Sequence, residues 1–230
     1  MIILAMDGLE IKYVESFECE HLKQEVFGKT DISDFKEPRT IVLWASFLTG
    51  KNMEERVLSS KDLWSFRVNV KETFFSKFKR YKAIDVPAFT YELNIHQRER
   101  EMLKKYFEKS IDVNKYDKVA LENHRKIKKQ FLESLNENYE ILMCYFAIAD
   151  VIGHLSFGLK SKMRLVYKEL DEIAKIAREA DKKVLIISDH GMKPIGRFGD
   201  HSNYGFWSLS IKKPLQKPKL TAFRRIIENL

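Results

Sequence analysis

Three acidic residues directly follow apolar runs that the sequence predicts as buried β-strands. They are Asp7 after residues 2–6, Asp150 after residues 141–149 and Asp189 after residues 184–188. The carboxyl ends of parallel strands meet at one edge of an α/β sheet, where ligands bind. Carboxylates brought together at that edge repel one another when they are unpaired. A multivalent cation is therefore their expected partner.

Histidine placement supports a metal site. Three of the six histidines lie close to a carboxylate: His154 follows Asp150 by four residues, His190 follows Asp189, and His201 follows Asp200. Mixed carboxylate and imidazole ligands suit Zn²⁺, Mn²⁺ or Fe and fit Ca²⁺ poorly. A single Asp–His pair often forms only a surface hydrogen bond, but three pairs together with Asp7 indicate a metal centre. The remaining histidines lack this context and are expected to be surface or helix residues: His21, His96 and His124.

Thr40 is the hydroxyl with the best placement for anion chemistry. It precedes the apolar run 41–48, which predicts a buried helix with Thr40 as its N-cap. Backbone N–H groups and the helix dipole favour an anion at such a position. A purely structural cap is compatible with this role. Ser46 and Thr49 are competing hydroxyls, one inside the helix and one near its far end.

The elements that must position these residues alternate between strand and helix, which predicts an α/β fold with a mostly parallel sheet. Strands are expected at residues 2–6, 81–89, 141–149, 184–188 and 205–211, and helices at 41–48, 96–109, 116–136, 160–180 and 222–230. The length of 230 residues suits one domain over residues 1–230. Residues 55–138 are poorer in strand patterns and are the candidate helical insertion or cap.

Composition excludes several protein classes. Hydrophobic residues make up 44% and charged residues 32%, which argues against wholesale disorder. Cys19 and Cys144 are too few for a disulfide scaffold, and Cys144 is expected to be a buried free thiol. No run approaches the ~20 apolar residues that span a bilayer. The first residues do not resemble a signal peptide. These features predict a cytoplasmic protein without a membrane partner.

Basic residues exceed acidic ones, with a formal net charge of +8. Residues 71–130 hold 16 Lys and Arg against 9 Asp and Glu. This excess could attract a phosphate-bearing substrate or nucleic acid. Because the charges alternate in sign along the predicted helices, solvated helix faces are the favoured interpretation.

Five motifs occur in a distinctive serial order. They are Asp7-Gly8, the segment from Thr40 to Thr49-Gly50, Asp150 to Gly153-His154, Asp189-His190-Gly191-Met192, and His201 to Gly205. In this order they resemble the alkaline phosphatase superfamily, and its phosphodiesterase/nucleotide pyrophosphatase branch in particular. The resemblance implies a three-layer α/β/α core with a small helical insertion. It also implies two divalent metal ions, usually zinc with manganese as the alternative, and a covalent phospho-enzyme intermediate.

The resemblance also implies individual roles. One metal would be held by Asp7, Asp189 and His190 and shared with the nucleophile, and the other by Asp150, His154 and His201. Thr40 lies nine residues before Thr49, as the nucleophile does in the family, so Thr40 is the expected catalytic residue. The implied function is a two-metal phosphoryl-transfer hydrolase, in particular a phosphodiesterase/nucleotide pyrophosphatase with a phospho-threonine intermediate.

Alternatives remain at this point. One is a phosphomonoesterase or phosphomutase on the same core, and another is a non-catalytic relative that binds anions or nucleic acid. Monoesters carry more negative charge than diesters, and the segment 41–48 after Thr40 holds no cation. This absence favours a phosphodiester, in particular a nucleotide, as the small-molecule substrate. Trp44 could offer an aromatic surface, although a core position is favoured.

Overall fold

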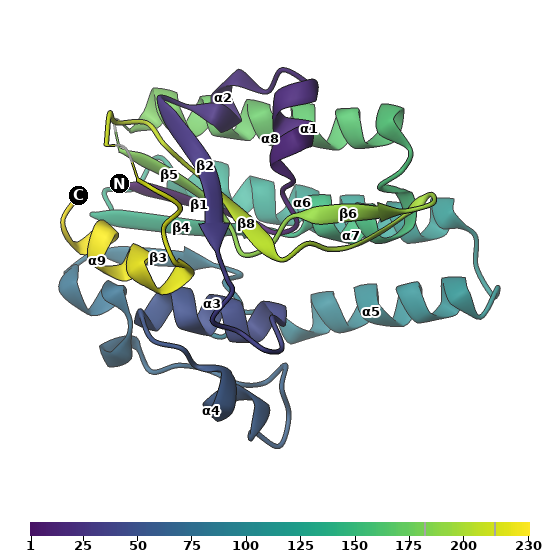
Figure 1. The fold of residues 1–230 in the computed structure, drawn as a ribbon, viewed down its shortest axis with the longest axis horizontal. Helices are drawn as coiled ribbons and strands as arrows, with labels where there is room; N and C mark the ends of the chain where they lie inside the picture. The colour runs from purple at the N-terminus through teal and green to yellow at the C-terminus, as the bar shows by residue number, and fades with distance from the viewer. Residues whose placement is uncertain (182, 214) are drawn as a thin grey trace.

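The computed structural model describes residues 1–181, 183–213 and 215–230, and its centre is a six-stranded sheet (Figure 1). The strand order is β2-β8-β5-β1-β4-β3. The strands are β1 (Ile2–Met6), β2 (Val26–Asp31), β3 (Tyr81–Ile84), β4 (Ile141–Phe146), β5 (Val184–Ser188) and β8 (Tyr204–Leu209). β1 runs parallel to β4 and β5, and β3 runs parallel to β4, whereas β8 is antiparallel to both of its neighbours. The prediction of a mostly parallel sheet is confirmed.

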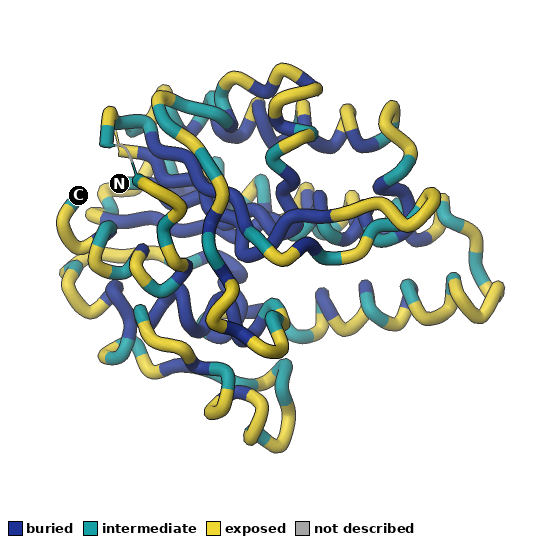
Figure 2. The backbone as a smooth tube through the Cα atoms, viewed as in Figure 1, coloured by how far each residue is buried: buried dark blue, intermediate teal, exposed yellow. Residues whose placement is uncertain are grey.

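Side chains of the central strands alternate between two cores because successive residues of a strand point to opposite faces. In β1, Ile2, Leu4 and Met6 join one core, while Ile3 and Ala5 join the other. The central strands are buried along their whole length (Figure 2). Continuous apolar runs therefore mark these strands in the sequence, because both faces are covered.

Helices cover both faces of the sheet, which confirms the three-layer α/β/α arrangement (Figure 1). The first core is built with α1 (Ile11–Ser16), α2 (Glu20–Lys23), α6 (Val113–Ser134), α7 (Ile148–Ser156) and α8 (Lys160–Ala180). The second is built with α3 (Thr40–Thr49), α4 (Glu54–Leu58) and α9 (Phe223–Glu228). The helix α5 (Leu93–Phe107) packs along α6 and extends beyond the sheet.

Smaller elements complete the description. The strands β6 (Met192–Ile195) and β7 (Phe198–His201) form a separate antiparallel hairpin. Short 3-10 turns occur at Val70–Glu72, Phe74–Lys77 and Leu220–Ala222. Within 55–138, β3 pairs with β4 of the central sheet, and the division of the chain at this range stays a prediction.

Two predicted strands are shorter than expected. The run 141–149 is a strand only to Phe146, because α7 begins at Ile148 and Asp150 lies in its first turn. The run 81–89 is a strand only to Ile84, because Asp85 takes a positive φ of 56° and turns the chain. Apolar runs do not by themselves distinguish a buried strand from the buried start of a helix.

Two further expectations concern cysteines and membranes. Cys19 and Cys144 are both buried and free, as predicted for Cys144. Among the described residues, no helix combines the length and apolar character needed to cross a bilayer.

Candidate metal and phosphoryl-transfer site

Asp7 and Asp189 lie side by side at the carboxyl edge of the sheet. Asp7 directly follows β1 and Asp189 directly follows β5, and these neighbouring parallel strands pair Ala5 with Ile187. The two carboxylates are 1% and 0% exposed. The parallel register therefore brings them together as the sequence predicts.

Asp150 enters the same region from α7 and lies one helical turn before His154. The spacing of four residues puts both side chains on one face of the helix, and His154 Nε2 lies 3.3 Å from Asp150 Oδ2. Gly8 permits this approach, because a Cβ at its φ of +70° would lie 2.8 Å from the Cα and Cβ of Asp150. A glycine after Asp7 thus allows the chain leaving β1 to pack directly against α7.

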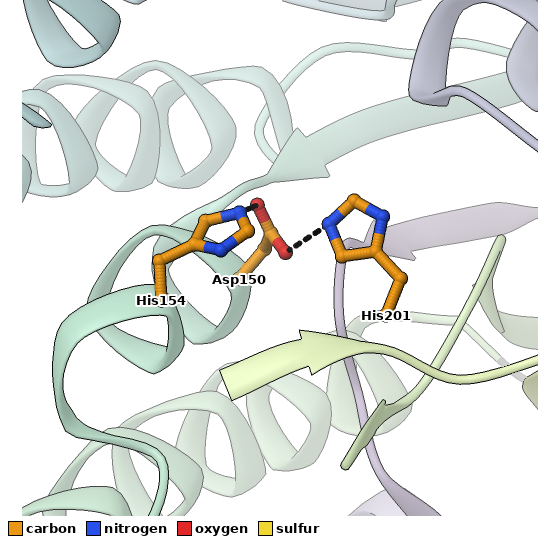
Figure 3. A group of neighbouring side chains, drawn as sticks. All are labelled: Asp150, His154 and His201. Carbon is orange, nitrogen blue, oxygen red and sulfur yellow. Dashed lines mark ion pairs between the residues drawn. The ribbon is translucent and has the colours of Figure 1, made fainter. Parts of the chain in front are cut away.

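His201 comes from the end of β7 and closes the other side of Asp150. Its Nε2 lies 3.4 Å from Asp150 Oδ1, so the two imidazoles flank one carboxylate (Figure 3). The His201 ring also stacks on His190, with ring centroids 3.7 Å apart and an interplanar angle of 18°. The hairpin of β6 and β7 therefore delivers His201 to the site.

Ligand-type atoms gather in two overlapping groups, each with all its atoms within 4.8 Å of one another. One group is Asp150, His154 and His201, and the other is Asp7, Asp150 and His190. The first group is the set expected from the sequence. In the second group, Asp150 takes the place beside Asp7 and His190 that the sequence assigns to Asp189. Asp189 lies next to this group, because His190 Nε2 is 3.7 Å from Asp189 Oδ2 and 3.1 Å from Asp7 Oδ1. Asp150 thus lies between the two groups.

Many polar atoms of this cluster are buried without a hydrogen-bond partner among the described residues. They are Asp7 Oδ1, Asp150 Oδ1, Asp189 Oδ1 and Oδ2, His190 Nε2 and His201 Nε2. Buried polar atoms in native proteins are nearly always satisfied. Carboxylate oxygens and imidazole nitrogens are the donor atoms that Zn²⁺ and Mn²⁺ accept. The donor set therefore fits divalent cations.

Electrostatics of the cluster point the same way. Burial raises the pKa of Asp189 well above its usual range, and the negative charge of Asp7 adds to this effect. Burial would also raise the pKa of Asp150, but His154 and His201 together hold it well below its usual range. In return, the Asp150 carboxylate raises the pKa of His154 to about 9. The carboxylates thus need positive charge beside them, which either protonated imidazoles or bound cations supply.

Thr40 faces the cluster across a shared cavity of about 220 Å³. Thr40, Asp7, Asp150, His154 and His201 all line this cavity. The N-cap of α3 is Arg39 rather than Thr40, because Arg39 keeps an extended backbone while Thr40 is the first helical residue. The predicted capping role is therefore wrong, but the position at the helix N-terminus is retained.

The competing hydroxyls of α3 are not available at this cavity. Ser46 Oγ donates a hydrogen bond to the Val42 carbonyl, and Thr49 Oγ1 donates to the Ala45 carbonyl. Both side chains are buried inside the layer of helices and do not line the cavity. Trp44 is fully buried as well, so it is a core residue.

Two histidines that looked unremarkable in sequence are buried beside carboxylates. His96 on α5 lies between Asp85 and Glu99, with Nε2 2.7 Å from Asp85 Oδ2 and Nδ1 2.9 Å from Glu99 Oε2. His124 on α6 lies 3.2 Å from Glu169 of α8. Both lie on helices as expected, but a surface position is wrong for them. Only the spacing of three residues from His96 to Glu99 was visible in the sequence.

Tyr145 is a site residue that sequence patterns did not reveal. Its hydroxyl donates a hydrogen bond to Asp7 Oδ2, and it also lines the cavity with Thr40. Tyr145 lies within the apolar run of β4, and nothing in the sequence distinguishes it from the core residues around it. Its contact with Asp7 depends on the pairing of β1 with β4.

Taken together, these observations define a three-layer α/β protein with a cluster of Asp and His side chains at the carboxyl edge of its sheet. Residues 1–205 match the model of the type I phosphodiesterase/nucleotide pyrophosphatase family, and the chain belongs to this family. A 2,3-bisphosphoglycerate-independent phosphoglycerate mutase of Sulfurimonas denitrificans is 32% identical over 84 residues. That match covers 36% of this chain and 17% of the mutase.

Solved structures with a similar fold include murine ectonucleotide pyrophosphatase/phosphodiesterase 5. An inactive threonine-to-alanine variant of that protein, in complex with AMP, has a TM-score of 0.53 at 13% identity. A second structure of the same protein has a TM-score of 0.50 at 15% identity. Each match covers 86% of this chain and 58% of the murine chain, so this chain spans little more than half of its structural relative.

Proposed function

We propose that this protein is a phosphoryl-transfer hydrolase that uses Thr40 as its nucleophile and two divalent metal ions as cofactors. The observation that carries the proposal is one cavity lined by Thr40 and by four members of the Asp/His cluster. Several donor atoms of this cluster are buried without a hydrogen-bond partner among the described residues. Zinc is the favoured metal, with manganese as the alternative, because the donors are mixed oxygen and nitrogen atoms.

The proposed ligands divide into two sets, Asp7, Asp189 and His190, and Asp150, His154 and His201. Asp150 lies close enough to both groups to belong to either. Bound divalent ions would stabilise the negative charge on the phosphoryl oxygens and on the attacking and leaving oxygens. All remaining contributions come from the chain itself.

Thr40 Oγ1 would form the new bond to phosphorus while the bond to the leaving oxygen breaks, which yields a phospho-threonine. The Thr40 hydroxyl gives up its proton to solvent, and the leaving oxygen takes up a proton to become the alcohol. Water then cleaves this intermediate and releases phosphate or a phosphate monoester. The N-terminus of α3 offers N–H groups that are not used within the helix. Leu43 is the first residue of α3 whose N–H donates a helical hydrogen bond, to the Arg39 carbonyl. The preceding N–H groups of the first turn are thus available to a negatively charged oxygen.

A phosphodiester or pyrophosphate of the nucleotide type is the substrate class that we propose. The structural relative of similar fold binds AMP, and its threonine-to-alanine variant is described as inactive. The family model that matches residues 1–205 is named for the same two activities. Carried to this chain, these facts support Thr40 as the nucleophile and a nucleotide as the ligand.

A phosphomonoesterase or phosphomutase on the same core is the second candidate. The phosphoglycerate mutase that is 32% identical over 84 residues favours it. The two candidates share Thr40 and the Asp/His cluster and differ in the charge of the phosphate that they accept, because a monoester near neutral pH carries about two negative charges.

The test is a side-by-side assay of metal-loaded protein on p-nitrophenyl thymidine monophosphate and p-nitrophenyl phosphate. A higher kcat/KM for the thymidine diester supports the phosphodiesterase proposal, and a clear preference for the monoester supports the second candidate. If protein with bound metal cleaves neither ester, the hydrolase proposal is wrong, and a phosphomutase or a non-catalytic anion-binding role replaces it.

A further inference from the structure

One wall of the cavity is formed by α5 and is not used by the mechanism proposed above. His96, Arg100 and Leu103 recur at spacings of four and three residues on α5, so they share one helix face. All three line the cavity that also holds Thr40. Within the described parts of the chain, Arg100 is the only lysine or arginine that lines it.

Arg100 is held in place by a stack of planar side chains. Its guanidinium carbon lies 3.9 Å from the centroid of the Trp64 ring. The Trp64 ring lies nearly parallel to Tyr91, with centroids 6.3 Å apart, and Tyr91 stacks on His96 at 4.1 Å. A guanidinium that lies over an aromatic face keeps its N–H groups at the edge free for hydrogen bonds. The stack therefore orients Arg100 without consuming its donors.

The nearby carboxylates are already paired with other groups. Glu99 uses Oε2 for His96 Nδ1 and Oε1 to accept a hydrogen bond from Asn123 Nδ2 at 2.8 Å. Asp85 faces His96 Nε2 and accepts a hydrogen bond from the backbone N–H of Glu92. Arg100 itself has neither an ion pair nor a hydrogen bond among the residues that the structure describes. A half-buried guanidinium in this state is a natural binding group for an anion.

The position of Arg100 along α5 indicates which part of a ligand it would meet. The His96 ring lies 6.0 Å from the ring of Tyr145, whose hydroxyl donates a hydrogen bond to Asp7 of the Asp/His cluster. Arg100 follows about one helical turn later. Trp64, its stacking partner, comes from the segment between α4 and the first 3-10 turn and also lines this wall. Arg100 is therefore placed to contact the organic part of an ester whose phosphoryl group lies at Thr40.

We propose that Arg100 is a specificity-determining residue that binds an anionic group, a carboxylate or a second phosphate, on the organic part of the substrate. This inference rests on the proposed function, because it assumes that the phosphoryl group lies beside Thr40. The expectation drawn from residues 41–48 concerned the charge of the phosphoryl group beside Thr40, whereas Arg100 would meet a charge on the organic part. The preferred substrates are thus phosphate esters that carry a second negative group.

The test measures binding rather than turnover. Three small phosphates share one primary alkyl phosphate and differ in the tail: ethyl phosphate has a neutral tail, 2-phosphoglycolate a carboxylate, and ethane-1,2-diol bisphosphate a second phosphate. Each is titrated calorimetrically into metal-loaded Thr40→Ala protein, in which the esters stay intact. We expect at least one anionic tail to lower Kd about tenfold relative to ethyl phosphate, as a charge-assisted hydrogen bond does. The tail that gains affinity identifies the carboxylate or the phosphate.

Variants then assign the gain to Arg100. Adding Arg100→Gln should bring the Kd of the anionic ligands to that of ethyl phosphate, and Arg100→Lys should keep part of the gain. Arg98→Gln is the matched control, because Arg98 is exposed on α5, does not line the cavity and loses the same charge. Thermal melting confirms that each variant is folded before its affinity is compared.

Two results would overturn the inference. One is an equal Kd for all three phosphates in Thr40→Ala protein that keeps Arg100. The other is a ratio of Kd between ethyl phosphate and the anionic ligands that Arg100→Gln leaves unchanged. The outcome is separable from the proposed function. If the anionic tails bind more tightly but the parent protein does not hydrolyse nitrophenyl esters, the hydrolase proposal alone is overturned. Hydrolysis without discrimination would overturn the Arg100 inference alone.

Discussion

The hydroxyl of Tyr145 on β4 donates a hydrogen bond to Asp7 Oδ2, which directly follows β1. The two residues meet because β1 and β4 pair in parallel with Ala5 opposite Tyr145. The bond leaves Asp7 Oδ1 facing His190 Nε2 at 3.1 Å. A neighbouring strand thus decides which oxygen of Asp7 is available to the cluster.

Replacing Tyr145 with Phe should weaken metal binding about 10- to 100-fold, the usual cost of losing a group that orients a metal ligand. Competition with a chromogenic chelator measures the change. Tyr13→Phe is the control, because the Tyr13 hydroxyl donates to the Phe157 carbonyl at 2.7 Å, away from the cluster. An unchanged metal affinity in Tyr145→Phe would show that the hydrogen bond does not orient Asp7.

Metal content should reach about two divalent ions per chain after reconstitution with zinc or manganese. Asp150→Asn should lower it below one, because Asp150 belongs to both ligand groups. Asp200→Asn is the matched control, since Asp200 is an exposed residue paired with Lys193. Elemental analysis gives the result, and no more than trace metal in the parent protein would rule out a binuclear site.

Thr40→Ala should abolish turnover of a nitrophenyl ester while metal content stays near that of the parent. Thr40 is not the N-cap of α3, so the free energy of unfolding should fall by much less than the ~1 kcal/mol that loss of a capping side chain costs. Thr40→Ser should keep most of the activity, because it keeps the hydroxyl. Parent-like rates in the alanine variant would disprove the assignment of the nucleophile.

His96 should make stability depend on pH in the mildly alkaline range. Although burial opposes it, the hydrogen bonds to Asp85 and Glu99 raise the pKa of His96 from 6.5 to about 9. A raised pKa stabilises the fold fully below pH 6.5, and this contribution is lost as the pH rises through about 9. We expect the free energy of unfolding to fall by a few kcal/mol over this interval.

Urea unfolding at several pH values measures this effect, and His96→Gln isolates it. The variant should be less stable at pH 6.5 because it leaves buried carboxylates unpaired. It should also lose the part of the pH dependence that His96 contributes. An identical pH profile in both proteins would exclude a protonated His96 in the folded state.

Gly8→Ala should destabilise the protein and weaken metal binding together. A side chain at Gly8 would meet the backbone of Asp150 at 2.8 Å, in addition to the strain of a positive φ. Gly196→Ala separates the two effects, because Gly196 has a φ of +61° and nothing within 4 Å of the added Cβ. We expect both variants to melt lower, but only Gly8→Ala to lose metal affinity. Equal metal affinity in the two variants would argue against a role for the close approach.

Local patterns in the sequence predicted much of the architecture and part of the site. Apolar runs identified β1 and β5, and the residues directly after them are Asp7 and Asp189. The spacing of Asp150 and His154 matches one turn of a helix, although the apolar run 141–149 predicts a strand where α7 already begins at Ile148. These features extend over a few residues, so periodicity and flanking residues are enough to reveal them.

Contacts between distant segments were decided only by the tertiary structure. Tyr145 reaches Asp7 through strand pairing, and Arg100 reaches the cavity of Thr40 because α5 packs along α6. The partner Asp85 of His96 lies in a turn made by a positive φ. Strand order and helix packing follow from the burial of whole faces rather than from neighbours in sequence. The role of a buried charge or hydroxyl therefore depends on which residues strand pairing and helix packing place next to it.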